Sequence, residues 1–197
     1  MIAILDYGSG NIRSASRACE KVGAETVVTS DFDIARNASG LVVPGVGAFG
    51  SCMNQLRDIN GEALIRERFA SGRPTLGICV GMQILFSASD ESSEQGIGVF
   101  PERVERIASP ILPHIGWNSV KSNATMQLFT GIEKELFYFV HSYAVKTGIS
   151  KGDTATTEYG EEFISAIEFE SLSAVQFHPE KSGDAGLQLL RNWIDNL

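Results

Sequence analysis

The sequence predicts one α/β domain over residues 1–197, with a central, mostly parallel sheet, helices on both faces and an antiparallel extension in the second half. Three observations support this prediction. Short apolar runs alternate with helical patterns in the first half. Strand-forming runs separated by turn residues fill the second half. The 197 residues suffice for one sizeable core but not comfortably for two, and no repeat or linker divides them.

The first half is expected to consist of strand–helix units. The helical pattern after the first strand keeps its apolar residues on one side and stops at Gly23, and Gly61 interrupts a longer helical stretch. Such alternation is typical of a parallel sheet covered on both faces. In chain order, the expected elements are strands at Ile2–Leu5, Glu25–Thr29, Leu41–Val43 and Thr75–Ile78, and helices at Asn11–Val22, Cys52–Phe69 (broken near Gly61) and Met82–Ala88.

The second half is expected to form the antiparallel extension. Its last strand should return to the main sheet near Phe177, and an amphipathic helix should close the chain. The expected elements are strands at Val99–Ile107, Gly116–Lys121, Leu136–Val145, Ala155–Glu158, Phe163–Phe169 and Ala174–Phe177, and a helix at Gly186–Trp193.

Composition and charge exclude several classes of protein. No apolar run approaches the roughly 18 residues of a membrane helix, and the N-terminus lacks the basic stretch of a signal peptide. With 16 basic and 24 acidic residues, the net charge of -8 disfavours nucleic-acid binding. Three widely spaced cysteines fit neither a disulfide framework nor a metal site. We therefore expect a cytoplasmic protein without membrane, nucleic acid or metal.

Cys79 lies where a strand turns sharply into a helix. The segment Gly77-Ile78-Cys79-Val80-Gly81 has the spacing of a nucleophile elbow, in which side chains two residues before and after the nucleophile would collide. The turn lifts the sulfur above the carboxyl edge of the sheet, and the amides of the next helix stabilise a thiolate. The alternative, a cysteine that simply packs in the core, remains open for Cys79 and is preferred for Cys19 and Cys52.

His178 and Glu180 supply a base and its orienting group. His178 emerges at the end of the strand Ala174–Phe177, within AVQFHPEKS. In an extended chain residues two apart face the same side, so Glu180 is expected to hold one ring nitrogen while the other faces Cys79. Nucleophile, base and orienter then form a triad. Taken singly, His178 could be a capped strand end and Glu180 an exposed charge.

A glycine-rich turn, Pro44 to Gly47, follows the third strand. A thiolate that attacks a carbonyl creates an oxyanion, which backbone amides must stabilise. We expect these amides to come from Val46 and Gly47, together with that of Val80, the residue after the nucleophile. An ordinary turn or a phosphate cradle is the alternative, but GxGxxG spacing and a Walker lysine are lacking.

These motifs resemble those of class I, triad-type glutamine amidotransferases. The motifs that carry the resemblance are GICVGMQ, PGVGAF and QFHPE. Within that family, the further runs DYGSGN, PHIGWN, YFVHSY and HPEKSGDAGLQLL are similar to the glutaminase subunits of imidazole glycerol phosphate synthases. The resemblance covers essentially the whole chain and implies a single amidotransferase domain with a flavodoxin-like, hydrolase-like fold and no cofactor.

The resemblance also implies a reaction. Cys79 attacks the side-chain amide of L-glutamine, His178 transfers the protons, and water hydrolyses the glutamyl thioester. Positions matching Gln83 and Glu91 hold the amino-acid end of the substrate, with Ser142 and Tyr143 completing the pocket. From the residues alone, Gln83 could equally be a helix-surface residue and Glu91 a loop charge.

A partner is expected because free ammonia is protonated in water and loses its nucleophilicity. The resemblance identifies that partner as the (β/α)₈ cyclase subunit, which uses ammonia to make imidazole glycerol phosphate and an aminoimidazole carboxamide ribotide in L-histidine biosynthesis. The segment PHIGWN, with Pro113, His114, Trp117 and Asn118, is the candidate interface of this heterodimer. Trp117 suits an interface anchor, but a core position is equally open. We expect activity to rise when the partner binds its ligand.

Three other functions compete. The first is an amidotransferase subunit for another acceptor, such as those serving anthranilate or aminodeoxychorismate synthesis. The second is a cysteine peptidase or related thiol hydrolase. The third is a catalytically silent binding module that only activates a partner. PHIGWN and DYGSGN speak against the first, the glutamate of HPE against the second, and the intact triad against the third.

Overall fold

The centre of the sheet is built from strands that are apolar along their whole length. In the computed structural model, which describes residues 1–197, β1 (Ile2–Leu5), β3 (Gly40–Gly45) and β4 (Thr75–Cys79) are buried at every position. Such strands belong in a parallel sheet that is covered on both faces. β2 (Thr26–Thr29) and β13 (Leu172–Val175) flank them in the order β2-β1-β3-β4-β13, and every neighbouring pair is parallel.

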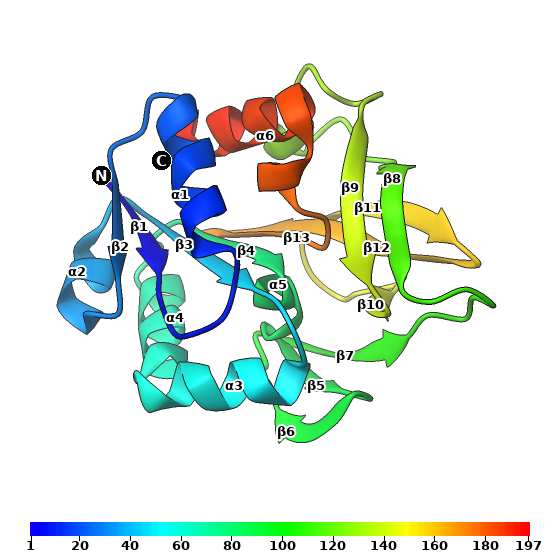
Figure 1. Ribbon diagram of the computed structural model, residues 1–197, viewed down its shortest axis with the longest axis horizontal. Helices are drawn as coiled ribbons and strands as arrows, with labels where there is room; N and C mark the ends of the chain where they lie inside the picture. Colours follow the sequence, from blue (N-terminus) through cyan, green and yellow to red (C-terminus); the bar gives the residue numbers. More distant parts are fainter.

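Helices cover both faces of this parallel part (Figure 1). α1 (Ile12–Lys21) and α6 (Gly183–Asp195) lie together on one side, and α2 (Phe32–Asn37), α3 (Phe49–Asp58) and α4 (Gly61–Ala70) lie on the other. The chain moves outward from β1 to β2 and then returns to β3 on the opposite side of β1. In open α/β sheets, ligands bind beyond the carboxyl ends of the strands near such a reversal.

The second half extends the sheet mainly by antiparallel pairing, with the exception of β5 and β7, which run parallel to each other. The order continues from β13 through β12 (Glu161–Phe169), β10 (Tyr143–Lys146), β7 (Phe100–Arg106), β5 (Phe86–Ser89) and β6 (Ser92–Gln95), while β11 (Asp153–Tyr159) pairs with β12. β8 (His114–Ser119) and β9 (Leu136–His141) form a separate two-stranded ribbon. Short 3-10 turns η1 and η2 cover Gln127–Phe129 and Pro179–Lys181.

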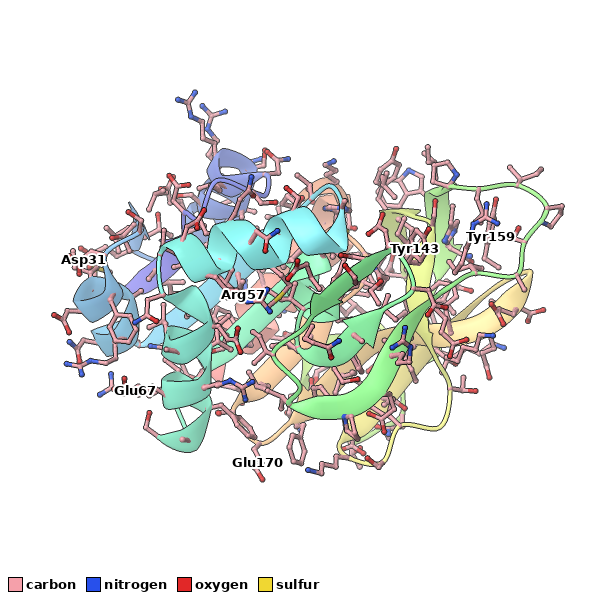
Figure 2. All side chains as sticks on the ribbon, turned by 90° about the horizontal axis from the view of Figure 1, so that it is seen from below. Asp31, Arg57, Glu67, Tyr143, Tyr159 and Glu170 are labelled. Atoms are coloured by element: carbon pink, nitrogen blue, oxygen red, sulfur yellow. The ribbon has the colours of Figure 1, made fainter.

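One hydrophobic core of 52 buried residues runs through both halves, so the α/β fold is a single unit. Arg57, at the end of α3, ties the helical layer to β6 by donating to the Glu94 carboxylate at 2.6 Å and to the Gln95 carbonyl (Figure 2). No helix in the structure has both the length and the apolar character needed to cross a membrane.

The predicted element types are confirmed along most of the chain, with four differences. The helix expected over Met82–Ala88 is wrong: α5 covers only Val80–Gln83, and Phe86–Ser89 is strand β5. A short apolar run does not distinguish a buried strand from a helix, and here pairing with β6 and β7 decides. The run Leu136–Val145 breaks at Ser142 into β9 and β10, which belong to different sheets.

The third difference is β6, a strand that was not predicted, and the fourth is the equally unpredicted helix α2. Its N-cap, Asp31, accepts a hydrogen bond from the Ile34 amide at 2.9 Å. The break predicted near Gly61 is confirmed, because α3 ends at Asp58 and Asn60 has a left-handed φ of 59°.

Candidate active site

Cys79 occupies a strained corner at the carboxyl end of β4. Its φ of 58° and ψ of -113° lie in a region that non-glycine residues rarely adopt, and α5 begins at the next residue. A Cβ on Gly77 would lie 2.5 Å from the Gly81 carbonyl oxygen, so the predicted need for glycine is confirmed, although the clash is with the backbone rather than with a second side chain. A Cβ on Gly81 would instead overlap the carbonyl oxygen of Val43 in β3, a constraint that no local pattern reveals.

His178 reaches the same edge of the sheet because β13 runs parallel to β4, with Val175 beside Ile78. Its Nδ1 lies 2.8 Å from Oε1 of Glu180, and both side chains are buried. The predicted contact therefore exists, but an extended chain does not make it. Residues Pro179–Lys181 form a 3-10 turn that folds the carboxylate back beneath the ring.

The surroundings of His178 favour its protonated form. Burial by itself lowers the pKa of this ring, but the neighbouring Cys79 sulfur and the hydrogen-bonded Glu180 carboxylate outweigh it and raise the pKa of His178 to about 9. The ring therefore takes up a proton readily, as a base beside a thiol must. Burial raises the pKa of Cys19 to about 12 and also raises that of Cys52, so neither thiol is a good nucleophile near neutral pH.

A cavity of about 630 Å³ opens above the Cys79 sulfur. It lies beyond the carboxyl ends of β3, β4 and β13, where the topology places ligand sites. Most of the residues expected at the site line it: Val46, Gly47, Cys79, Val80, Gln83, Glu91, Pro113, Ser142, Tyr143 and His178. Glu180 lies behind His178, outside the cavity lining.

The glycine-rich turn is tied down by hydrogen bonds to neighbouring loops. The Val46 amide donates to Ser9 Oγ at 3.2 Å, and Ser9 Oγ donates to the Val46 carbonyl at 2.7 Å. Cys52 Sγ donates to the same carbonyl at 3.3 Å. The Val46 amide is thus engaged within the protein, whereas Gly47 lines the cavity with a φ of 92°. Val80 opens α5, so its amide has no partner within the helix.

Gln83 and Glu91 both line the cavity, but one side chain is buried and the other is exposed. Gln83 is buried, and its Nε2 donates to the Tyr143 carbonyl at 2.9 Å and to Gln176 Oε1 at 3.0 Å. Glu91 is exposed, and its Oε2 accepts the Phe49 amide at 2.7 Å, which caps α3. The second carboxylate oxygen of Glu91 remains for a ligand.

The candidate interface residues divide between surface and interior. Trp117 is 55% exposed, and Ile111, Ile115 and Leu136 are also exposed apolar residues on or beside the β8–β9 ribbon. His114 is different: it is buried, with its ring stacked between those of Phe139 and Tyr159. The His114 side chain therefore does not contribute to the surface that Trp117 occupies.

Sequence reasoning missed several residues around the sulfur. Gln176 Nε2 lies 3.8 Å from Cys79 Sγ, and Asn11, Val140 and Lys181 line the cavity. Gln176 lies two residues before His178, so the period-two rule applied to AVQFHPE is a signal for it. Among the acidic, cysteine and histidine side chains, no group of three or more is arranged to hold a metal ion.

Comparison with known proteins gives concordant matches. Residues 3–197 match the family model of Glutamine amidotransferase class-I. The protein named imidazole glycerol phosphate synthase subunit HisH from Mycobacterium bovis is 53% identical over 201 residues, covering 100% of this chain and 98% of the relative. Its namesake from Corynebacterium diphtheriae is 51% identical over 207 residues, covering 100% and 99%. A crystal structure of a glutamine amidotransferase shares the fold with a TM-score of 0.79, at 20% identity over 98% of this chain and 97% of that one.

Proposed function

Because this chain belongs to the class I glutamine amidotransferase family, we propose that it acts as the glutaminase subunit of an imidazole glycerol phosphate synthase in histidine biosynthesis. The observation that carries the proposal is the arrangement at one sheet edge. A cysteine on a nucleophile elbow faces a histidine whose pKa is raised to about 9, and a buried carboxylate holds that histidine from behind. This arrangement suits acyl transfer through a thioester.

The reaction begins when Cys79 Sγ attacks the side-chain amide carbon of L-glutamine. His178 holds the thiol proton and passes it to the departing nitrogen, which leaves as ammonia. The acyl group remains on sulfur as a thioester. Water then attacks this thioester, His178 takes the proton from the water, and glutamate leaves. Glu180 keeps Nδ1 of the ring occupied, so that the other ring nitrogen serves the sulfur.

The negative charge on the carbonyl oxygen needs amide donors. The amides of Val80, Val46 and Gly47 are the candidates, with that of Val46 available only after its bond to Ser9 opens. We assign the amino-acid end of glutamine to Gln83, Glu91, Ser142 and Tyr143, because they line the cavity on the side of β10 and of the β5–β6 turn. A carboxylate such as Glu91 suits the substrate ammonium group.

The chain acts as one subunit of a complex, as the names of its relatives indicate for those proteins. We assign the acceptor site to a cyclase subunit with a (β/α)₈ barrel, which receives ammonia without its passing through water. We place the docking surface on the β8–β9 ribbon, where Trp117 and Ile115 are exposed, and the complex in the cytoplasm.

The test is glutamate release from L-glutamine by the purified chain, alone and with the cyclase subunit and its ribotide ligand. We expect release mainly in the liganded complex and a loss of at least about 10³-fold in Cys79→Ala. Cys19→Ala is the matched control, because this thiol is buried away from the cavity and should leave the rate within about twofold.

Two outcomes would overturn the proposal. A wild-type chain that remains silent in the liganded complex would favour the binding module. Full activity in Cys79→Ala would remove the nucleophile from the mechanism.

A further inference from the structure

Two buried histidines outside the triad contact each other directly. His114 Nδ1 lies 3.1 Å from His141 Nε2, and both side chains are buried. They face each other across the β8–β9 ribbon, where His114 is the register partner of His141. Figure 2 marks Tyr143 and Tyr159 on the lobe of the molecule that holds this pair. Buried polar groups persist only when their hydrogen bonds are satisfied, so each ring nitrogen needs a partner.

The partners determine which nitrogen of each ring carries the proton. His141 Nδ1 lies 3.0 Å from the Tyr143 carbonyl, which can only accept, so Nδ1 holds the hydrogen. A neutral imidazole has one N–H, so His141 Nε2 accepts, and the hydrogen between the two rings belongs to His114 Nδ1. Burial lowers the pKa of His114 to about 4 and that of His141 to about 3, which keeps both rings neutral.

The other end of this series of hydrogen bonds, at Asn118, independently requires the same direction of donation. His114 Nε2 must accept, and Asn118 Nδ2 lies 3.4 Å from it. The orientation of the Asn118 amide is set by two further bonds, because Nδ2 donates to the Glu158 carbonyl at 3.0 Å and Oδ1 accepts the Ser119 amide at 2.8 Å. All four ring nitrogens therefore have a partner. The hydrogen bonds are donated in one direction, from Asn118 to His114, from His114 to His141, and from His141 to the Tyr143 carbonyl.

The Tyr143 carbonyl connects this series to the cavity. It accepts from His141 Nδ1 and from Gln83 Nε2, so both of its lone pairs are used. The second hydrogen of Gln83 Nε2 goes to Gln176 Oε1, and Gln176 Nε2 approaches Cys79 Sγ at 3.8 Å. With both hydrogens of its amide occupied by protein acceptors, Gln83 presents its oxygen to the cavity that it lines.

We propose that His114 and His141 are positioning residues of the glutamine site: a neutral, directional pair that holds the Tyr143 carbonyl and thereby orients Gln83. This inference rests on the proposed function for its substrate. Because Asn118 is next to the exposed Trp117, the pair also links the candidate docking surface to the cavity. Glutamine binding should depend on the pair more than the chemical step does.

The experiment compares His141→Asn with His141→Leu, two side chains of similar size, in the complex with the cyclase subunit and its ligand. The Asn side chain places an N–H close to the position of Nδ1, whereas Leu has no donor. We expect His141→Leu to raise KM for L-glutamine about tenfold with kcat changed less than about threefold, and His141→Asn to recover most of the loss. His114→Phe preserves stacking with Phe139 and Tyr159 but removes the donor, and should raise KM in the same direction.

A second readout needs no activity. In nitrogen-15 spectra of the full chain at pH 7, both rings should carry hydrogen on Nδ1, and the side-chain amide signals of Gln83 should move in His141→Leu. A hydrogen on Nε2 of either ring, stationary Gln83 signals, or an unchanged KM in His141→Leu with normal melting would each overturn the inference. A wild-type complex without glutaminase activity would instead overturn the proposed function, and the spectra would still decide the inference.

Discussion

At the scale of single residues, the proton on His178 depends on two neighbours of different kinds. Cys79 and Glu180 both raise the pKa of the ring against the effect of burial. One neighbour is the reacting group, and the other is held at 2.8 Å by the turn that follows. Removing either neighbour should therefore move the titration of the ring without removing the ring itself.

The first prediction concerns that titration. By NMR of the isolated chain, His178 should titrate near pH 9, and Cys79→Ser and Glu180→Gln should each lower its pKa toward the ordinary value of 6.5. Because the folded-state value is the higher one, the stabilisation from this proton is complete below pH 6.5 and is lost as pH rises through about 9. The difference in free energy of unfolding between wild type and His178→Gln should fall by about 2–3 kcal/mol over that interval. A ring that titrates below 6.5 contradicts the assignment.

The second prediction concerns the bonds that hold the glycine-rich turn. In Ser9→Ala, the Val46 amide and carbonyl both lose the Ser9 hydroxyl as a partner. If that hydroxyl stabilises a resting turn by about 1 kcal/mol per bond, loss of the two bonds should raise glutamate release by the chain without its partner about 30-fold. Ser87→Ala is the control, since the Ser87 hydroxyl also makes two hydrogen bonds with the backbone, to the carbonyls of Pro101 and Glu102, away from the glycine-rich turn. A lower basal rate in Ser9→Ala would show that Ser9 supports the active turn instead.

Sequence reasoning reached the residues whose roles follow from local spacing. Cys79, with its two glycines, and the pair His178 and Glu180 lie within short motifs. The contacts Ser9–Val46 and Glu91–Phe49 join residues 37 and 42 positions apart, and each involves a backbone amide that has no signature of its own. Such contacts follow from the packing of loops and cannot be predicted from either segment alone.

At the scale of elements, one buried guanidinium joins three segments. Arg68 of α4 is fully buried and has no carboxylate partner. It donates instead to the carbonyls of Ala35, Arg36 and Ala38 at the end of α2, and to that of Pro74 before β4. The carbonyls of Ala35, Arg36 and Ala38 lie at a helix end, where the backbone lacks regular partners, whereas that of Pro74 also accepts from the Leu41 amide.

The third prediction follows from these bonds. Arg68→Met retains most of the side-chain volume but removes the donor to the carbonyls of Ala35 and Ala38, while those of Arg36 and Pro74 keep other donors. We expect the free energy of unfolding in urea to fall by at least about 3 kcal/mol, and Arg68→Lys to recover less than half, because an ammonium cannot reach both groups of carbonyls. Arg66→Met, on the exposed side of the same helix, should cost under about 1 kcal/mol. Equal losses in the two variants would exclude this role for Arg68.

Element types could be predicted where the hydrophobic period was unambiguous. The prediction failed where pairing with a distant strand determines the element type. Residues Phe86–Ser89 are apolar enough for either a helix or a buried strand, and only the distant partner β7 selects the strand. The division of Leu136–Val145 depends on two different sheets competing for one continuous strand-forming run. The helix α2 has six residues and carries too few periodic positions to be recognised.

At the scale of the whole molecule, the catalytic edge and the exposed apolar surface belong to different sheets. Cys79 and His178 follow strands of the 11-stranded sheet, whereas Trp117 lies on the two-stranded ribbon. Trp117 packs against Tyr138 edge to face, with ring centroids 5.8 Å apart, and still leaves more than half of its surface exposed. An aromatic residue held in place and exposed in this way is typical of an interface anchor.

The fourth prediction concerns this anchor. Trp117→Ala should weaken binding of the cyclase subunit about 100-fold, measured by titration calorimetry, while the melting temperature of the chain changes little because the side chain is already exposed. Ile34→Ala is the control, since Ile34 is an exposed apolar residue on α2. Unchanged affinity in Trp117→Ala would move the docking surface away from the ribbon.

The apolar residues on and beside the ribbon have a consequence for how much of this chain a cell can hold. Ile111, Ile115, Trp117 and Leu136 are between 47% and 70% exposed, and exposed apolar side chains promote self-association when no partner covers them. Chains synthesised in excess of the cyclase subunit would associate with one another or bind chaperones through these residues. If the cyclase subunit covers this surface as proposed, the cell has to make the two polypeptides in matched amounts. This requirement is separate from the demand for ammonia.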